Sequence, residues 1–307
     1  FGAAAGPPWR YYSGEVERDL TPGFLRELRP LEMGLVALRP SRSSVNLWLG
    51  RAAGTAPCHF DGYHNAFAQL HGAKRFVVAP PAASALLRPF PFLHPSHAQC
   101  QARLGVDGPA ATALRQAGSL QVDLAPGELL YLPPLWFHEV VALADAVSVN
   151  GWSDSEQGDA AAQLFALRRP SHIHASGDVD LDAAPRRADA PTEAAALIAR
   201  LSAAAAGAPA ALVRGVWRER YAALVAEGEL LAPPLTPPPD CAALAPPRHL
   251  RAPDEPPEVE AWVRAAADLA TTRLPASARH LWLGNLAELV AAEHVGAERA
   301  AAFWRAL

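Results

Sequence analysis

The sequence is short of several residue types, and each shortage narrows the possible classes of protein. Among its 27 basic residues only Lys74 is a lysine, and all the others are arginines. The basic residues do not outnumber the 31 acidic ones, and a formal net charge of −4 provides no general basic surface for nucleic acid. A nucleic acid is therefore not favoured as a partner.

Cysteines and long apolar runs are also scarce. Cys58, Cys100 and Cys241 lie far apart and form neither a CxxC pair nor a disulfide framework, which is typical of a reducing compartment. No apolar run approaches the roughly 20 residues that a membrane-spanning helix needs. We therefore expect an intracellular protein of the cytoplasm or nucleus, without a membrane segment. Because the sequence begins with Phe1, a targeting signal cannot be read from it.

The first half of the chain has the texture of short strands. Half of the 307 residues are apolar, which is enough for one sizeable core with an appendage. From about residue 45 to residue 152, short apolar runs alternate with Gly and Pro, and this pattern predicts a sandwich or a small barrel. The runs are 45–50, 65–70, 75–79, 120–124, 128–132 and 146–150. The span 80–118 has little strand signal, and we interpret it as a long insertion.

The second half of the chain is rich in alanine and has helical spacing. Two apolar stripes recur at intervals of three and four residues, as on one face of a helix. They are Trp217, Tyr221, Leu224 and Val225, and Trp282, Leu286, Leu289 and Val290. Residues 232–257 between them hold too many prolines for a regular helix, so we predict an extended connector. The sequence therefore predicts a β-rich domain over residues 1–170 and a helical C-terminal region over residues 171–307.

One apolar stretch carries a histidine and an aspartate two positions apart. His59 and Asp61 would share a face of a strand, as would Asn65 if the strand continues, because alternate side chains of a strand point to the same side. His138 follows a later apolar strand and a Pro-Pro turn. Two imidazoles and one carboxylate leave part of a metal open, and this is the ligand set of non-haem Fe(II) oxygenases. These three residues are the candidate metal ligands and catalytic residues.

Each of these residues also has a structural interpretation. An H-x-D pair is common, and a lone histidine is more often structural than ligating. The barrel-like surroundings, the second histidine on a later strand, and the unusual lysine downstream of Asp61 together favour the metal site. We interpret the neighbouring His64 and His71 as surface or substrate-rim residues.

Two stretches of the sequence resemble a known family. They are "NLWLG…HFDGYHNAFAQLHGAKRFVVAPP" and "GELLYLPPLWFHEV…VSVNGW", and they look like the JmjC/cupin-type Fe(II)- and 2-oxoglutarate-dependent oxygenases. The resemblance covers roughly residues 45–152. It is greatest with the small JmjC protein hydroxylases, among them the lysyl hydroxylase of translation-associated GTPases and the asparaginyl hydroxylase of hypoxia-inducible factor. It implies a mainly β catalytic core, a double-stranded β-helix of the jelly-roll or cupin type, followed by an α-helical C-terminal region.

The resemblance also implies a reaction and its participants. It implies His59, Asp61 and His138 as ligands of Fe(II), with 2-oxoglutarate as co-substrate and O₂ as oxidant. The co-substrate would be decarboxylated to succinate while a C–H bond of a protein side chain is hydroxylated. Lys74 would bind the distal carboxylate of 2-oxoglutarate, with Asn65 nearby.

Further positions are assigned by the same resemblance. Asn150 and Trp152 match a strand that lines the site. A tyrosine of an early strand would also contact the co-substrate, and Tyr12 or Tyr11 is the candidate. The family often has Ser or Thr three residues before the first ligand, where a hydroxyl can contact the carboxylate, whereas this sequence has Ala56, which offers no hydroxyl.

Two other functions and two arrangements of the helices stay open at this point. The same chemistry could act on a tRNA nucleoside, as in a related hydroxylase, although the acidic net charge counts against it. The fold could instead serve as a cupin binding module without catalysis, although the intact His/Asp/His set counts against that. The C-terminal helices could form a homodimer interface or a monomeric helical cap.

Overall fold

The computed structural model describes residues 11–19, 23, 43–105, 108–167, 190–205, 209–228 and 257–307. Two compact units contain them. The first unit lies within Phe1–Pro80 and Arg103–Gly158, and the second lies within Pro81–Ala102 and Asp159–Leu307. The predicted insertion is therefore divided, because residues 81–102 group with the C-terminal helices and the rest stays with the strands. A division at residue 170 does not anticipate this.

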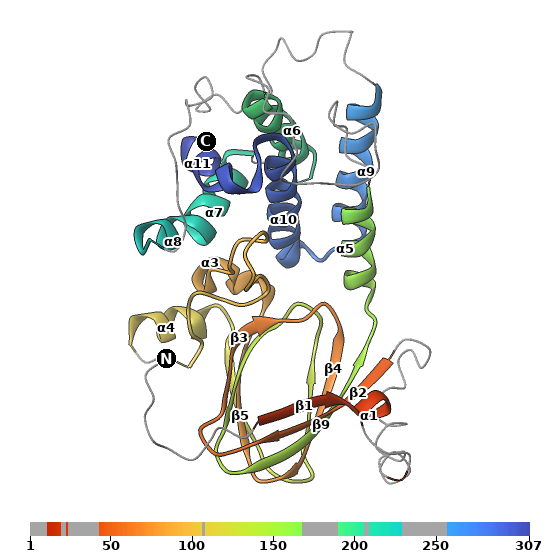
Figure 1. Cartoon of the computed structure of the whole chain (residues 1–307), viewed down its shortest axis with the longest axis vertical. Coiled ribbons are helices and arrows are strands. Elements are labelled where there is room, and N and C mark those ends of the chain that lie inside the picture. The colour runs from red at the N-terminus through yellow and green to blue at the C-terminus, as the bar shows by residue number, and fades with distance from the viewer. Residues whose placement is uncertain are drawn as a thin grey trace. The chain divides into compact units, whose positions relative to one another are not determined.

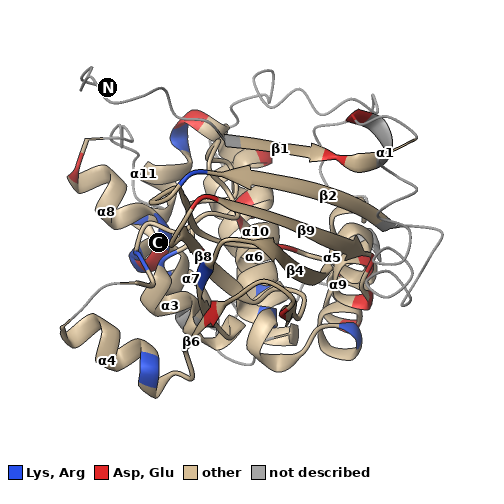
Figure 2. Cartoon of the chain, turned by 90° about the horizontal axis from the view of Figure 1, so that it is seen from below, with Lys and Arg blue, Asp and Glu red and all other residues tan. Residues whose placement is uncertain are grey.

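The first unit is a sandwich of two antiparallel sheets (Figure 1). One sheet has the order β1-β2-β9-β4-β7 and the other has the order β3-β8-β5-β6. Figure 2 shows β1, β2, β9 and β4 side by side. The strands are β1 (Tyr11–Glu15), β2 (Ser43–Gly50), β3 (Thr55–Phe60), β4 (His64–His71), β5 (Lys74–Ala79), β6 (Leu120–Leu124), β7 (Leu129–Leu132), β8 (Phe137–Ala142) and β9 (Ala146–Ser153). The predicted fold, a β core of jelly-roll type followed by helices, is confirmed.

Alternation along the strands gives each sheet an inner and an outer face. On the inner side, aromatic and aliphatic residues of both sheets pack together between them. This inner cluster is Phe67, Phe76, Val78, Leu124 and Leu132. On the outer face of the five-stranded sheet, Val45, Leu47, Ala68 and Val149 pack with Val16 of α1 (Val16–Asp19). The inner cluster fills one part of the sandwich and leaves another part open for a cavity.

A tight turn at Gly72 sets where β5 begins. Gly72 has a φ of +66°, and a Cβ there would lie 2.1 Å from the carbonyl oxygen of Asp145. Only glycine tolerates both the left-handed backbone and this close approach. Strand β5 therefore starts at Lys74 and pairs with β8 and β6 on its two sides.

The second unit is helical. α10 is buried along most of its length, which explains why its sequence is apolar on more than one face. The elements are η2 (Pro81–Ala83), α3 (Ser84–Leu87), α6 (Ala190–Ala205), α7 (Pro209–Val216), the π-helical turn η3 (Trp217–Tyr221), α8 (Ala222–Ala226), α9 (Pro257–Arg273), α10 (Ala276–Val295), η6 (Ala297–Arg299) and α11 (Ala300–Ala306). α4 (Pro109–Gln116) belongs to the first unit, and α5 (Glu156–Ala166) begins in the first unit and continues into the second.

A buried ion pair joins the helices of the second unit to residues 81–102. Arg220 Nη1 donates to Glu288 Oε1 at 2.6 Å, and both side chains are almost fully buried. The other oxygen of Glu288 accepts hydrogen bonds from the Tyr221 hydroxyl and the Phe92 N–H, each at 2.8 Å. Because both carboxylate oxygens of Glu288 have partners, its buried charge is compensated. The hydrogen bond from Phe92 also connects residues 81–102 to α10.

The predicted apolar stripes are largely buried inside the second unit. Tyr221, Leu224, Leu286 and Val290 are each at most 3% exposed within one chain. Trp217, Val225 and Leu289 of the same stripes are only partly buried, so a homodimer through these helices stays a prediction. The predicted connector lies outside the described residues, except for Pro257, which begins α9. None of the described helices combines the length and the apolar character needed to cross a membrane.

Candidate metal centre

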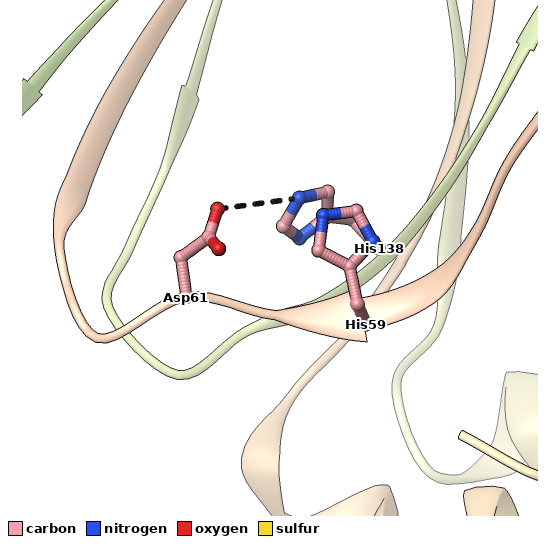
Figure 3. Close-up of side chains that lie close together, drawn as sticks. All are labelled: His59, Asp61 and His138. Carbon is pink, nitrogen blue, oxygen red and sulfur yellow. Dashed lines mark ion pairs between the residues drawn. The ribbon is translucent and has the colours of Figure 1, made fainter. Parts of the chain in front are cut away.

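Three predicted ligands come together in the first unit (Figure 3). His59, Asp61 and His138 each offer one ligand atom, and these atoms all lie within 4.8 Å of one another. His59 and His138 are direct partners in the β3–β8 ladder, with ring centroids 4.1 Å apart. Asp61 follows β3 directly, and its Oδ2 lies 3.7 Å from His138 Nε2.

The reason why these side chains meet differs in part from the prediction. Strand β3 ends at Phe60, so Asp61 lies in the following turn, and Asn65 comes from the next strand, β4. Continuous alternation from His59 to Asn65 is therefore wrong. His138 follows β7 and the Pro-Pro turn, as predicted, and is the second residue of β8.

A β-bulge turns His59 toward the inside of the sandwich. Ala56 pairs with Val140 and His59 pairs with His138, so three steps along β3 match two steps along β8. Ala56 and His59 both line the cavity although their spacing is odd. Pro57 lies within the bulge, where its missing N–H costs no ladder hydrogen bond. The bulge therefore reverses the alternation just before the first ligand.

Both imidazoles are oriented by backbone carbonyls. His59 Nδ1 donates to the Pro57 carbonyl at 2.7 Å, and His138 Nδ1 donates to the Trp136 carbonyl at 3.1 Å. In the neutral form of each ring the proton is then on Nδ1, and Nε2 carries a lone pair. A hydrogen bond to the far nitrogen is the usual way in which a protein fixes a metal-binding histidine.

The electrostatics of the cluster call for a cation. Burial, and next the charge of His59, lower the pKa of His138 to about 3, so this ring is neutral at pH 7. Burial raises the pKa of Asp61, and the charge of His59 opposes this effect. Asp61 Oδ2 is buried and has no hydrogen-bond partner among the described residues. Two imidazole lone pairs and an unpartnered carboxylate oxygen therefore converge without a donor between them, and this arrangement fits a divalent metal.

Two backbone contacts hold the turn that carries Asp61. The Asp61 carbonyl accepts the N–H of Leu135 at 2.7 Å, and Leu135 has a left-handed φ of +68°. The Gly62 carbonyl accepts the Ser155 hydroxyl at 2.6 Å, and Ser155 Oγ also accepts the N–H of Gly158 in the first turn of α5. A Cβ on Gly158 would lie 2.7 Å from the Gly62 oxygen, so a larger residue there would push the turn away.

A cavity lies beside the three candidate ligands, between the two sheets. Its remaining lining is mostly apolar or aromatic, with few polar side chains. Besides the ligands, it is lined by Trp48, Gly50, Gly54, Ala56, Asn65, Phe67, Lys74, Phe76, Leu132, Val140, Ala142, Asn150 and Trp152. A mostly apolar pocket with a few convergent polar groups is the usual form of a small-molecule site.

Lys74 is the buried cation of this cavity. It is 6% exposed, and burial lowers its pKa from the ordinary 10.5 to about 8. Its Nζ lies 5.0 Å from the centre of the Phe67 ring, and no ion pair within the described part of the chain involves it. The neighbouring Arg75 alternates to the outer face and makes a bidentate pair with Asp123. Lys74 therefore has no counter-ion among the described residues, whereas Arg75 on the opposite face has one.

The other predicted co-substrate residues divide into two groups. Asn65, Asn150 and Trp152 line the cavity, as does Ala56 at the position where the family often has Ser or Thr. Tyr12 does not line it, because Tyr12 pairs with Leu49 and packs with the outer cluster around Val16. The assignment of Tyr12 to the co-substrate is therefore not supported, and the side chain of Tyr11 lies outside the described part of the structure.

Two residues near the site were not predicted from the sequence. Trp48 lines the cavity, and its indole N–H donates to Asn150 Oδ1 at 2.5 Å. Ser155 positions the turn after Asp61, as described above. For Trp48 the available signal was its place in the quoted run "NLWLG". For Ser155 it was a serine directly before a helical segment, which is a common N-cap.

Comparison with known proteins gives a family match. The sequence profile of the family described as "Cupin-like domain" matches residues 4–159. Among curated proteins, the chain is 30% identical over 141 residues to human "Bifunctional peptidase and (3S)-lysyl hydroxylase JMJD7", covering 39% of this chain and 44% of that protein. It is 32% identical over 122 residues to "Lysine-specific demethylase JMJ31" of Arabidopsis thaliana, covering 38% of this chain and 22% of that protein.

The extent of these matches is limited. The chain spans less than half of the length of either of these curated relatives. Among solved structures, an oxalate decarboxylase of Bacillus subtilis matches with a TM-score of 0.26 and 14% identity, covering 48% of this chain and 25% of that chain.

Proposed function

Because the chain belongs to the family of cupin-like domains, we propose that it is an Fe(II)- and 2-oxoglutarate-dependent oxygenase that hydroxylates a protein side chain. One observation carries this proposal. A cluster of two imidazoles and a carboxylate shares a cavity with a buried lysine that has no ion-pair partner among the described residues. The cluster calls for a cation and the lysine calls for an anion, and a metal chelated by a dicarboxylate supplies both.

The ligand set supports iron over zinc. His59, Asp61 and His138 would bind the metal through two neutral imidazoles and one carboxylate, and this leaves positions open for a co-substrate and O₂. When bound, Fe(II) would supply O₂ activation coupled to the decarboxylation of 2-oxoglutarate to succinate. The residues of the chain hold the imidazoles in the correct tautomer, fix the Asp61 turn and keep the cavity largely apolar.

Lys74 has the properties of an anchor for the distal carboxylate. A carboxylate moved from water into this cavity costs several kcal/mol unless a charge meets it. The ammonium of Lys74 is compact and lies on a thin stem, and its Nζ is 5.0 Å from the centre of the Phe67 ring. The apolar wall around it strengthens the attraction, because water screens the two charges less there.

A protein side chain is the proposed substrate. Two relatives have lysine-directed activities in their names, a (3S)-lysyl hydroxylase and a lysine-specific demethylase. The net charge of −4 counts against tRNA, which is the alternative substrate within the same chemistry. An intracellular location is part of the proposal, since Cys58 is a buried free thiol.

The test is oxygen-dependent conversion of 2-oxoglutarate to succinate by protein reconstituted with Fe(II), followed by a screen of peptides for hydroxylation by mass spectrometry. We expect one Fe(II) per chain, with His138→Ala abolishing turnover while the circular dichroism spectrum is retained. His71→Ala is the matched control, because His71 is exposed and does not line the cavity. A tightly held tetrahedral zinc with no open position would refute the proposal. Activity on tRNA and on no peptide would show that the substrate is a tRNA nucleoside rather than a protein side chain.

A further inference from the structure

Three side chains form a hydrogen-bonded line along the wall of the cavity. Trp48, Asn150 and Asn65 come from β2, β9 and β4, which are adjacent in the five-stranded sheet. Trp48 Nε1 donates to Asn150 Oδ1 at 2.5 Å, and Asn150 Nδ2 donates to Asn65 Oδ1 at 3.0 Å. All three residues line the cavity, and both asparagines are almost fully buried.

The direction of this line is fixed at the tryptophan. An indole N–H can only donate, whereas an amide can either donate or accept depending on which way it is turned. Trp48 therefore requires the oxygen of Asn150, and this turns the Asn150 NH₂ group toward Asn65. Asn65 must then accept this hydrogen bond with its own Oδ1. The NH₂ group of Asn65 consequently donates to no other described residue.

The cavity wall consequently offers donors to a ligand. Besides Asn65, the polar residues that line the cavity away from the candidate metal ligands include Lys74, which carries an ammonium, and Trp152, which carries an indole N–H. The Trp152 N–H is buried and has no partner within the described part of the chain. A ligand rich in acceptor oxygens satisfies such a wall, whereas a ligand that presents donors leaves buried groups unpaired.

The geometry points to Trp48 as a positioning residue that selects an anionic, oxygen-rich ligand by fixing the orientation of two amides. It acts through Asn150 and Asn65, and need not touch the ligand through its own N–H. This inference rests on the proposed function, because it names 2-oxoglutarate as the acceptor-rich ligand. Without the indole donor the two amides can turn over, and Asn65 can then present an oxygen to a carboxylate.

The first experiment removes the donor and keeps an aromatic ring. Mn(II)-loaded wild-type protein and Trp48→Phe are titrated with 2-oxoglutarate by calorimetry. We expect roughly three- to tenfold weaker binding in the variant, which is the range expected for one net hydrogen bond. The affinity for Mn(II) should change by less than about twofold, because no metal ligand contacts the amide line through these bonds. Unchanged 2-oxoglutarate binding in Trp48→Phe would overturn the inference.

A double-mutant cycle distinguishes positioning from packing. In an Asn150→Ala background, Trp48→Phe should have little further effect on 2-oxoglutarate binding, because the path from Trp48 is already broken. If Trp48 only fills space, the two losses should multiply, and that result would overturn the inference.

A second pair of variants keeps Trp48 in place, in case its replacement harms folding. Asn150→Asp still accepts the indole N–H but can no longer donate to Asn65, so Asn65 should turn its NH₂ group toward the new carboxylate. Asn65→Ala should then weaken 2-oxoglutarate binding in the wild type but restore part of it in the Asn150→Asp background. The charge added by Asn150→Asp is present both with and without Asn65→Ala, so it does not affect the comparison of these two proteins.

The outcomes separate this inference from the proposed function. Equal losses from Asn65→Ala in both backgrounds would overturn the positioning role and leave the oxygenase proposal intact, provided that the wild type binds 2-oxoglutarate. Failure of Mn(II)-loaded wild type to bind 2-oxoglutarate would overturn both.

Discussion

Replacing Lys74 with methionine should weaken co-substrate binding and stabilise the apoprotein at the same time. Methionine keeps an unbranched, flexible stem of similar volume and removes the charge. A charge-assisted hydrogen bond contributes roughly 1.5–3 kcal/mol, so the KM for 2-oxoglutarate should rise at least about tenfold. Lys74→Arg should also be impaired, because a broad guanidinium does not fit where the ammonium lies 5.0 Å from the Phe67 ring.

The gain in stability follows from the burial of the charge. Burial lowers the pKa of Lys74 from the ordinary 10.5 to about 8, which at about 1.36 kcal/mol per pH unit corresponds to roughly 3 kcal/mol at pH 7. Removing the charge should therefore raise the free energy of unfolding of the apoprotein by about 1–3 kcal/mol at pH 7. The gain should shrink between pH 8 and pH 10.5, because the unfolded chain then holds the proton that the folded chain has lost.

Two assays check this prediction. Succinate formation at varied 2-oxoglutarate concentration gives the KM, and urea denaturation followed by tryptophan fluorescence gives the stability. Arg75→Met is the matched control, because Arg75 is the next residue of β5 and its side chain pairs with Asp123 on the outer face. It should leave the KM unchanged. A destabilised apoprotein together with an unchanged KM in Lys74→Met would show that Lys74 is a structural lysine and that another group holds the co-substrate.

Three more predictions follow from the same geometry. In the wild type, kcat/KM for 2-oxoglutarate should fall as the pH rises above about 8, because Lys74 of the free enzyme loses its proton there. The fall should be absent in Lys74→Met, and a flat pH profile of the wild type would contradict the prediction. Ser155→Ala should weaken Mn(II) binding several-fold by loosening the turn after Asp61, and calorimetry showing wild-type affinity would remove Ser155 from the support of the site. Glu288→Ala should destabilise the protein by about 3–5 kcal/mol in urea, because it leaves Arg220 buried without its partner, whereas breaking the exposed Arg75–Asp123 pair should change stability little.

Much of the β core could be predicted from local sequence alone. Gly and Pro mark the turns, and the apolar runs between them match β2, β4, β5, β6, β7 and β9 to within a few residues. Lys74 could be placed because the turn at Gly72 fixes where β5 begins, and alternation then separates Lys74 from Arg75. These features depend on a few consecutive residues, which is why a pattern of period two captures them.

Other features depend on the pairing of strands distant in sequence. The bulge in β3 reverses the side on which His59 lies, and only the register with β8 reveals it. The local sign of a bulge was Pro57, because proline within a strand is found mainly at bulges and edges. Tyr12 lies on the outer face because of its pairing with Leu49, and a difference of one position decides which face a tyrosine takes. Residues 81–102 belong to the helical unit through contacts such as the hydrogen bond from the Phe92 N–H to Glu288. These two residues are almost 200 positions apart, so no local sequence pattern predicts their contact.

The charged groups of the cavity make physical sense only together. For stability alone, apolar residues of similar volume would serve better than Asp61 and Lys74, because burial pushes both toward their neutral forms. Among the described residues, nothing supplies a cation to Asp61 and the two imidazole lone pairs or an anion to Lys74. A metal alone would leave Lys74 uncompensated, and a free carboxylate alone would be repelled by Asp61. A dicarboxylate that chelates the metal at one end and reaches Lys74 at the other meets both needs, so the two halves of the site are expected to bind cooperatively, with the metal raising the affinity for the co-substrate.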